Sequence, residues 1–279
     1  MTDDDFSFLA QIVRRRSGLI LPAHKPRFVT GQLAPVARRF GFRSIDGLIA
    51  ELRHGRDSLA RAVTEAMTTN ESSFFRDKPA FEQFRDLVLP HLIEARAKAK
   101  RLRIWSAACA AGQEPYSIAM LLDDAGLAAK GWSIDLIATD LSAEMVARGE
   151  EGLYSHFEIQ RGLAIRRLVA NFSQEGGNWR IAENLRRMVT FRAFNLLDSY
   201  GWLDDLDVVF CRNVLIYFDA KTKASVLDKI AEILQPDGAL VLGHAELVRG
   251  LSDAFVPLDH APMLFAKGKA VAQRYAAAG

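Results

Sequence analysis

The sequence of 279 residues predicts an α/β protein with a largely parallel sheet, helices on both of its faces, and an all-helical region before it. From residue 102 onward, short apolar runs alternate with helical stretches, which is the pattern of right-handed β-α-β crossovers. Before residue 79, apolar residues recur at helical spacing without a clear strand pattern. Hydrophobic residues make up 49% of the chain, so there is enough apolar material for an extensive core.

We expect the helical N-terminal domain to occupy residues 1–78. Its four helical segments read FSFLAQIVRRRSGL, FVTGQLAPVARRF, SIDGLIAELRHG and SLARAVTEAMT. Gly18, Gly41 and Gly55 fall at the expected helix ends, where glycine commonly terminates a helix. A further helix, KPAFEQFRDLVLPHLIEARAKAK, leads into the second domain, which we expect to occupy residues 79–279.

In the second domain, strands are expected in LRIWSAA, SIDLIATD, LDVVFCRNVLIYF, GALVLGHAE and APMLFAKG, with helices between most of them. The last two strands follow one another without a long helix, so one of them is expected to be antiparallel. Residues 150–194 interrupt this alternation. A turn at Gly176 and Gly177 indicates a small antiparallel β-subdomain, inserted at about residues 170–194.

The composition argues against several classes of protein. Cys109 and Cys211 are the two cysteines, and each lies in an apolar stretch, which indicates buried thiols in a reducing compartment. The acidic N-terminus is no secretory signal, and no apolar run is long enough to span a bilayer. We therefore expect a cytoplasmic protein without direct membrane insertion. A net charge of +2 without a basic, aromatic stripe argues against nucleic acid as a partner.

Positive charge is concentrated in the N-terminal domain. Residues 1–78 contain 13 lysines and arginines against 9 acidic residues, a difference of +4, whereas the remainder has 23 against 25, a difference of −2. The basic side chains include those of residues 14–16 and 38–39. They form either an ordinary solvated surface or a docking face for an acidic partner.

Ligands of open α/β sheets bind beyond the carboxyl ends of the strands, and polar residues are expected there. In IWSAACAAGQEPYS, residues 106–112 are mostly small and let a ligand approach the backbone closely. Glu114 follows them, and its carboxylate suits a cationic amino group, although a glutamate also favours a helix N-terminus. The segment lacks G-x-G-x-x-G, which argues against a dinucleotide site and an NAD-linked oxidoreductase.

Two further strand ends carry polar residues. Asp140 ends SIDLIATD, where a carboxylate can accept both hydroxyls of a ribose, but Asp140 or Ser142 could also cap the next helix. Arg212 and Asn213 interrupt an apolar run over residues 208–218. A charge in such a run is costly unless it serves a ligand or a partner, or forms a structural salt bridge.

The segment TTNESSFFRD, residues 68–77, combines a polar run with two phenylalanines and has more hydrogen-bonding groups than a turn requires. Together with IWSAACAAGQEPYSIAM, IATDLS, FNLLD and FCRNVLIYFD, in this order, it resembles the CheR-type chemotaxis receptor methyltransferases. The similarity extends over nearly the whole chain. It implies a Rossmann-like class I methyltransferase fold, the cofactor S-adenosyl-L-methionine (SAM), and S-adenosyl-L-homocysteine (SAH) as product.

The resemblance also implies an activity and its partners. The activity is O-methylation of glutamate side chains on the cytoplasmic helical signalling domains of chemoreceptors, for adaptation in chemotaxis. The turn in SQEGGNWRI is shorter than in members that bind a receptor's C-terminal pentapeptide, so we expect no dependence on that peptide. We also expect a monomer and no bound metal. The alternatives are a non-catalytic SAM-sensing adaptor of the same fold, or a methyltransferase acting on a different signalling protein, a small molecule or a nucleic acid.

Site residues follow from the family motifs. Glu114 corresponds to the contact with the methionyl amine, Asp140 to the ribose contact, and Asn195 and Leu196 lie near the adenine. Ser72 stands where the family often has threonine, and keeps the hydroxyl. The complete expected cofactor set is Asn70, Ser72, Arg76, Glu114, Asp140, Asn195, Leu196, Arg212 and Asn213.

Two of the expected site residues are given catalytic roles. We expect Arg76 to steer the target carboxylate and Tyr217 to line the point of methyl transfer, with neither acting as a general base. Residues 68–77 are expected to close over the cofactor. Phe74 and Phe75 are expected to anchor this segment in the interface between the helical and sheet domains.

Overall fold

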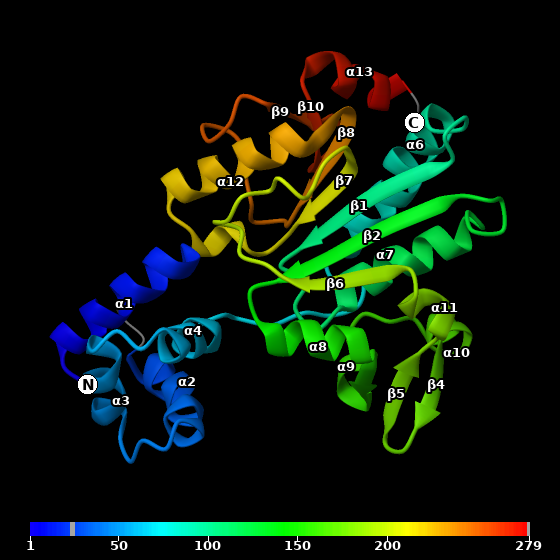
Figure 1. Ribbon diagram of the computed structural model, residues 1–279. Coiled ribbons are helices and arrows are strands. Elements are labelled where there is room, and N and C mark those ends of the chain that lie inside the picture. The colour runs from blue at the N-terminus through cyan, green and yellow to red at the C-terminus, as the bar shows by residue number, and fades with distance from the viewer. Residues whose placement is uncertain (23–25, 278–279) are drawn as a thin grey trace.

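The computed structural model describes residues 1–22 and 26–277. Figure 1 shows a helical domain beside a larger sheet domain, with a small β-subdomain projecting from the latter. The helical domain consists of α1 (Asp3–Ser17), α2 (Pro26–Arg39), α3 (Ile45–Arg53) and α4 (Asp57–Ala66). A capping box of Thr2 and Asp5 starts α1, and Gly18, with φ of 78°, ends it.

The main sheet has seven strands in the order β6-β2-β1-β7-β8-β10-β9. The first five pair in parallel, β10 is antiparallel to β8, and β9 is antiparallel to β10, so the expected antiparallel strand is present. Their bounds are β1 (Arg101–Ala107), β2 (Ser133–Asp140), β6 (Val189–Ala193), β7 (Leu206–Cys211), β8 (Leu234–Leu242), β9 (Phe255–Leu258) and β10 (Ala261–Lys267). This mixed sheet and the all-α domain confirm the predicted fold class.

Helices cover both faces of the sheet, as a parallel arrangement requires. One face is covered by α5 (Lys78–Gln83), a π-helical turn (Phe84–Val88), α6 (Leu89–Ala95) and α7 (Gln113–Asp124). The other is covered by α12 (Ala220–Ile233), as Figure 1 shows. The remaining helices of this domain include α8 (Ala143–Glu151) and α13 (Lys269–Ala277).

Alternate residues of β7 belong to two different hydrophobic cores. Val208 and Phe210 pack with α5–α7, whereas Val209 and Cys211 pack with α12. The second core is continuous with the buried residues of the helical domain, such as Leu9. The helical domain therefore packs on the same side of the sheet as α12.

The β-subdomain differs from the prediction for about residues 170–194. Its sheet has the order β3-β5-β4, with β3 (Leu153–Ser155), β4 (Phe172–Glu175) and β5 (Asn178–Ile181), and its helices are α9 (His156–Gln160), α10 (Ile165–Asn171) and α11 (Glu183–Arg186). The hairpin turns at Gly176 and Gly177, as predicted. β6, by contrast, is an edge strand of the main sheet, because Val189 and Phe191 bury their side chains in the core there.

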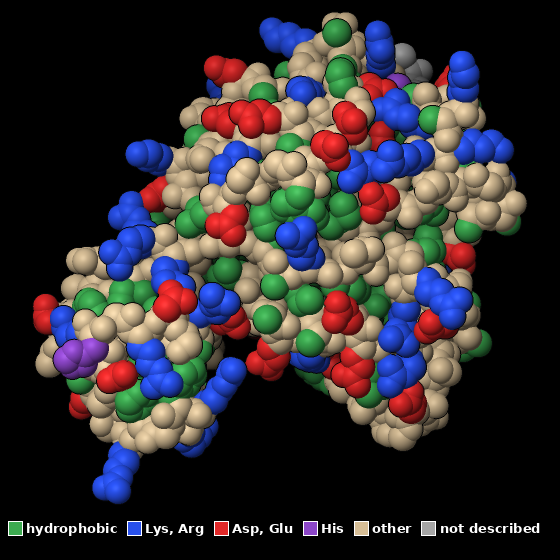
Figure 2. Space-filling model, viewed as in Figure 1, with side chains coloured by type: hydrophobic (Ala, Val, Ile, Leu, Met, Phe, Trp, Pro, Cys, Tyr) green, Lys and Arg blue, Asp and Glu red, His purple; other side chains and the backbone are tan. Residues whose placement is uncertain are grey.

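The molecular surface has a notch between two projecting parts. In Figure 2 the helical domain and the β-subdomain project from the same side of the sheet domain, and Lys and Arg side chains of the helical domain extend toward the gap. Within the described part of the chain, no helix combines the length and the apolar character needed to cross a membrane.

Candidate functional site

A pocket lies beyond the carboxyl ends of β1, β2 and β7, against the helical domain. It encloses about 850 Å³ of empty space, part of which is open to solvent. Residues from six separate segments of the sequence meet there. All ten residues predicted for cofactor binding or catalysis line this pocket: Asn70, Ser72, Arg76, Glu114, Asp140, Asn195, Leu196, Arg212, Asn213 and Tyr217.

The bend between β1 and α7 forms one wall of the pocket. Ala108, Ala110 and Gly112 all have positive φ, at 55°, 49° and 91°, so the chain turns sharply and exposes its backbone. A Cβ on Gly112 would meet the Cα of Gly149 at 3.1 Å, besides two aromatic side chains at the same distance. Only glycine satisfies both the conformation and the close packing at this position.

Asp140 holds this bend from the end of β2. Its Oδ2 accepts the backbone N–H of Ala110, and its Oδ1 that of Ser142, each at 2.9 Å. The cap of α8 belongs to Ser142, whose hydroxyl accepts the N–H of Met145. Burial raises the pKa of Asp140, and the two backbone N–H groups oppose that shift.

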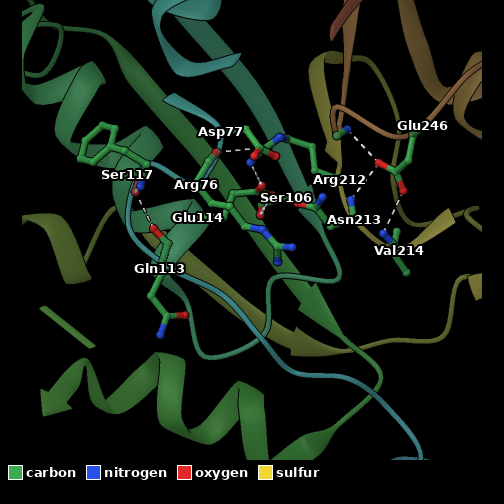
Figure 3. Close-up of polar contacts among 12 residues, drawn as sticks. Arg76, Asp77, Ser106, Gln113, Glu114, Ser117, Arg212, Asn213, Val214 and Glu246 are labelled. Atoms are coloured by element: carbon green, nitrogen blue, oxygen red, sulfur yellow. Dashed lines mark hydrogen bonds and ion pairs between the residues drawn. The ribbon is translucent and has the colours of Figure 1, made fainter. Parts of the chain in front are cut away.

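Glu114 is paired with Arg212 at the base of the pocket (Figure 3). The guanidinium Nη1 lies 2.8 Å from Oε2 of Glu114, and the hydroxyl of Ser106 donates to the other carboxylate oxygen, also at 2.8 Å. Burial raises the pKa of Glu114, while Arg212 and Ser106 act in the opposite direction. The salt bridge considered for Arg212 is therefore present, in a residue that also lines the pocket.

Arg212 also contacts the segment over residues 68–77, which we call the strap. Its Nη2 donates to the carbonyl of Arg76 at 2.6 Å and to Oδ2 of Asp77 at 2.9 Å. Its Nε is buried and has no hydrogen-bond partner in the described part of the protein. This N–H is a buried donor that the described residues leave unsatisfied.

The strap is held by its own contacts around Arg76. Phe75 and Asp77 have φ of 51° and 54°, an uncommon conformation for such residues, and they flank Arg76. The backbone N–H of Phe75 donates to the hydroxyl of Ser117 at 2.9 Å. Arg76 is half-buried, and its Nη1 donates to the carbonyl of Glu71 at 2.7 Å.

The prediction that Phe74 and Phe75 anchor the strap between the two domains is wrong. Phe74 is fully buried inside the sheet domain, edge-on to Tyr154 and Phe172 of the β-subdomain at centroid distances of 5.0 and 5.5 Å. Phe75 lies against Phe81, at 5.3 Å. The aromatic core around them is provided by the sheet domain, so they anchor the C-terminal end of the strap there. At the other end, the hydroxyl of Thr68 donates to the carbonyl of Glu65 in α4.

The end of α1 supplies another wall, which sequence reasoning missed. Ser17 and Leu19 line the pocket, and Leu19 forms an antiparallel bridge with Phe218. The backbone N–H of Ile20 donates to the carbonyl of Tyr217 at 2.9 Å. Nothing in the spacing of these residues distinguishes them from any other helix terminus.

Asn195 joins the two domains. Its side-chain Nδ2 donates to the carbonyl of Arg16 at 2.6 Å, and its Oδ1 accepts the N–H of Leu197 at 3.0 Å. Both ends of the amide are thereby engaged within the protein. Leu196 beside it is almost fully buried and presents an apolar surface to the pocket.

One more buried acidic residue behind the pocket was not predicted. Glu246 follows β8 and accepts hydrogen bonds from the loop after β7, which carries Asn213 and Tyr217. The sequence predicts this residue in the strand GALVLGHAE, whereas β8 ends at Leu242. Its partners are backbone N–H groups, which leave no pattern in the sequence.

The pocket suits a nucleoside ligand that carries a charged amino-acid group. The buried carboxylate of Glu114 suits a cationic amine, and that of Asp140 suits a ribose diol. The unpaired Nε of Arg212 suits a carboxylate. Leu141, Phe194, Leu196 and Val214 offer the apolar surface that a flat base requires. Among the described residues, no group of three or more His, Cys, Asp and Glu is arranged to hold a metal ion.

Comparison with known proteins assigns both domains. A family model described as "CheR methyltransferase, SAM binding domain" matches residues 70–263, and "CheR methyltransferase, all-alpha domain" matches residues 4–68. "Chemotaxis protein methyltransferase 1" of Pseudomonas aeruginosa is 38% identical over 269 residues, which cover 95% of this chain and 98% of the relative. "Chemotaxis protein methyltransferase Cher2" of Pseudomonas putida is 38% identical, and "Chemotaxis protein methyltransferase" of Vibrio parahaemolyticus is 37% identical; they cover 95% and 91% of this chain, and 98% and 93% of the relatives.

Proposed function

This chain belongs to the CheR methyltransferase family, and we propose that it methylates glutamate side chains on the cytoplasmic helical signalling domains of chemoreceptors. The products are glutamate methyl esters and SAH, and the role is adaptation in chemotaxis. The observation that carries the proposal is the convergence of ten motif residues on one pocket of a SAM-binding domain.

Individual residues divide the recognition of SAM between them. Glu114 binds the methionyl amine, Asp140 accepts the ribose hydroxyls, and the free Nε of Arg212 serves the methionyl carboxylate. Asn195 uses one amide N–H and one oxygen lone pair within the protein, so its second N–H is left for the adenine, beside the apolar contact of Leu196 and Phe194. When bound, SAM supplies a methyl group on a positively charged sulfur.

The acceptor needs little acid–base help. A glutamate side chain has a reference pKa of about 4.3 and is already ionised near neutral pH. Opposite charges approach one another and cancel during the transfer, so a site that holds little water favours the reaction. The protein's main task is alignment, which in favourable cases lowers a barrier by ~7–11 kcal/mol.

Arg76 and Tyr217 perform this alignment in our proposal. Arg76 donates one hydrogen bond to the carbonyl of Glu71, and its remaining N–H donors are available to the target carboxylate. Tyr217 lies at the end of a short 3-10 turn and lines the same pocket, where it borders the acceptor and excludes water. Neither residue removes a proton, since the acceptor carries none.

The helical domain brings the receptor to this pocket by its positive charge. Arg14 pairs with Asp219 and Arg16 with Asp57, so these arginines are partly engaged within the protein. Arg38 and Arg39 at the end of α2 are exposed and form no ion pair with any described residue. They are the better candidates for contact with an acidic receptor helix.

We propose that the enzyme works as a monomer and does not depend on a receptor's C-terminal pentapeptide, and the β-subdomain supports the second of these two statements. The hairpin of β4 and β5 closes with only Gly176 and Gly177 between paired residues, so it offers little loop for peptide docking. We accordingly place the protein in the cytoplasm, where it reaches the receptor's signalling helices directly.

The test is incubation with SAM labelled on the methyl group and receptor-containing membranes, followed by mild alkali. Release of labelled methanol is the expected result, because methyl esters hydrolyse under these conditions whereas N-methyl groups do not. The Asp140→Ala variant, which loses a carboxylate of the pocket, serves as the control for SAM dependence. Binding of SAH without any labelled receptor would instead indicate a SAM-sensing adaptor or a different protein substrate.

A further inference from the structure

Glu246 collects four backbone N–H groups from two loops (Figure 3). Its Oε2 accepts the N–H groups of Asn213 and Gly243, both at 2.8 Å. Its Oε1 accepts those of Val214, at 2.9 Å, and Leu215, at 2.8 Å. The residue is 4% exposed, so little water competes for these hydrogen bonds.

The loop after β7 depends on this carboxylate because its first backbone N–H groups have no partners in any described strand or helix. Asn213 has φ of 58°, which turns the chain out of the strand direction, and a 3-10 turn then follows over Leu215–Tyr217. The N–H groups of residues 213–215 lie beyond the strand and ahead of the turn's own hydrogen bonds. One carboxylate satisfies all three of them, with charge-assisted hydrogen bonds.

The fit between the two loops is tight. A Cβ on Gly243 would lie 2.7 Å from Nδ2 of Asn213 and 2.8 Å from Oε2 of Glu246. Any larger residue at Gly243 would displace the carboxylate or the asparagine. The loop after β8 and the loop after β7 are therefore packed as one unit around Glu246.

Glu246 does not line the pocket, but the loop that it holds does. Asn213, Val214 and Tyr217 all face the pocket from this loop. We propose that Glu246 is a positioning residue that fixes residues 213–217, and through them Tyr217, in the geometry required for methyl transfer. This inference rests on the proposed methyltransferase function and assigns a role to a residue that touches neither cofactor nor acceptor.

The same strand offers a matched control. Asp207 lies near the start of β7 and is also buried, with Oδ2 accepting the N–H of Arg103 and Oδ1 pairing with Arg96, each at 2.8 Å. It stands at the opposite edge of the sheet from the pocket. Asp207→Asn therefore replaces a buried carboxylate that has no part in the site by a neutral amide.

The test compares Glu246→Gln with Asp207→Asn. Glutamine keeps the size of the side chain but turns an NH₂ group toward two of the four N–H groups. Both variants are expected to melt at a lower temperature. Only Glu246→Gln is expected to lower kcat, by about 10- to 100-fold, because a displacement of about 1 Å in an aligning group is enough for that. Its Kd for SAH should change much less than kcat, since Glu114 and Asp140 keep their places and only the contacts of Asn213 and Val214 are disturbed.

A double-mutant cycle separates positioning of Tyr217 from general loss of stability. In a Tyr217→Ala background, Glu246→Gln should cost much less of kcat than in the wild type, because its effect is exerted through the missing ring. Fully multiplicative losses, or an unchanged kcat in Glu246→Gln, would overturn the inference. If Glu246→Gln does not fold, Glu246→Asp provides the same comparison with a shortened carboxylate.

Amide hydrogen exchange keeps this inference distinct from the proposed activity. Glu246→Gln should speed exchange at residues 213–215, and Asp207→Asn should leave it unchanged there. Wild-type protein that releases no alkali-labile methyl would reject the proposed activity. Unchanged exchange at residues 213–215 would reject the role of Glu246, whatever the activity.

Discussion

Arg212 and Glu114 form an ion pair, with 2.8 Å between Nη1 and Oε2, although only 1% of the arginine side chain is exposed. The same guanidinium donates hydrogen bonds to the carbonyl of Arg76 and to the carboxylate of Asp77. One buried cation therefore joins the end of β7, the start of α7 and the strap. This single charge therefore ties the strap to the wall of the pocket, in addition to the strap's own contacts.

Replacing Arg212 should damage both stability and binding. Arg212→Met leaves Glu114 and Asp77 without their cation, and loss of one partner from a buried pair costs about 3–5 kcal/mol. We expect the free energy of unfolding in urea to fall by about that amount and SAH binding to be lost in calorimetry. Arg96→Met, which breaks a pair with Asp207 and Asp237 far from the pocket, should lose stability and keep SAH binding. Retention of SAH affinity in Arg212→Met would contradict the role given to this residue.

The affinity for SAH should depend on pH through Asp140. Burial raises the pKa of this carboxyl above its usual value of about 3.9, and the ribose hydroxyls need its ionised form. SAH binding should weaken as the pH falls through the raised pKa, and Asp140→Asn should lose this component of the pH dependence. Calorimetric titrations from neutral to acid pH, with Asp140→Asn measured in parallel, would detect it.

The same shift affects folding in the opposite sense. Because the native pKa of Asp140 is raised, the native state favours the neutral carboxyl. Its contribution to the free energy of unfolding is largest below the unfolded pKa of about 3.9 and declines as the pH rises through the native value. An Asp140 carboxyl that titrates below 3.9 in the folded protein, by NMR, would contradict both statements.

Arg76 should matter for the receptor more than for the cofactor. Arg76→Ala removes the group that steers the acceptor, and kcat/KM for receptor methylation should fall by about 10- to 100-fold. Arg76→Lys keeps the charge and should recover part of this loss. SAH affinity should change far less than turnover in both variants. Wild-type turnover with unchanged apparent affinity for the receptor in Arg76→Ala would exclude the steering role.

Receptor docking should respond to charge at the end of α2. Arg38→Glu combined with Arg39→Glu should raise KM for the receptor and leave SAH affinity intact, and added salt should shrink the difference. The control is Lys98→Glu with Arg101→Glu, which makes the same change in net charge beside the start of β1, at the edge of the sheet opposite the pocket. Equal KM values for the two double variants would reject a docking role for α2.

Local patterns in the sequence were enough to find most pocket residues, because a polar residue that ends or interrupts an apolar run marks the end of a buried strand. Asp140 ends an apolar run that is buried in the structure, and Arg212 interrupts another. Glu246 gives no such indication, since a carboxylate that binds backbone N–H groups needs no particular neighbour in sequence. The sequence predicts residues 189–193 in the inserted β-subdomain, but they form β6 of the main sheet. A local pattern does not specify which sheet a strand joins.

The strap shows where sequence reasoning about packing ends. Two adjacent phenylalanines indicate an apolar anchor. The two rings that pack against Phe74, however, belong to Tyr154 and Phe172, which lie about 80 and 100 residues away in the sequence. Choosing between a domain interface and a domain interior requires the path of the chain through space. The family resemblance, by contrast, identified the fold from motifs that need no such path.

The bridge between Leu19 and Phe218 joins the two domains at the wall of the pocket. A chain that began at residue 79 would keep the sheet and both carboxylates, yet it would lack Ser17, Leu19 and the strap, and its pocket would be an open shelf. Exchange of the helical domain between relatives would consequently alter cofactor retention along with receptor choice. Recombinants of this kind should be functional only when α1 and the segment around Phe218 come from the same parent.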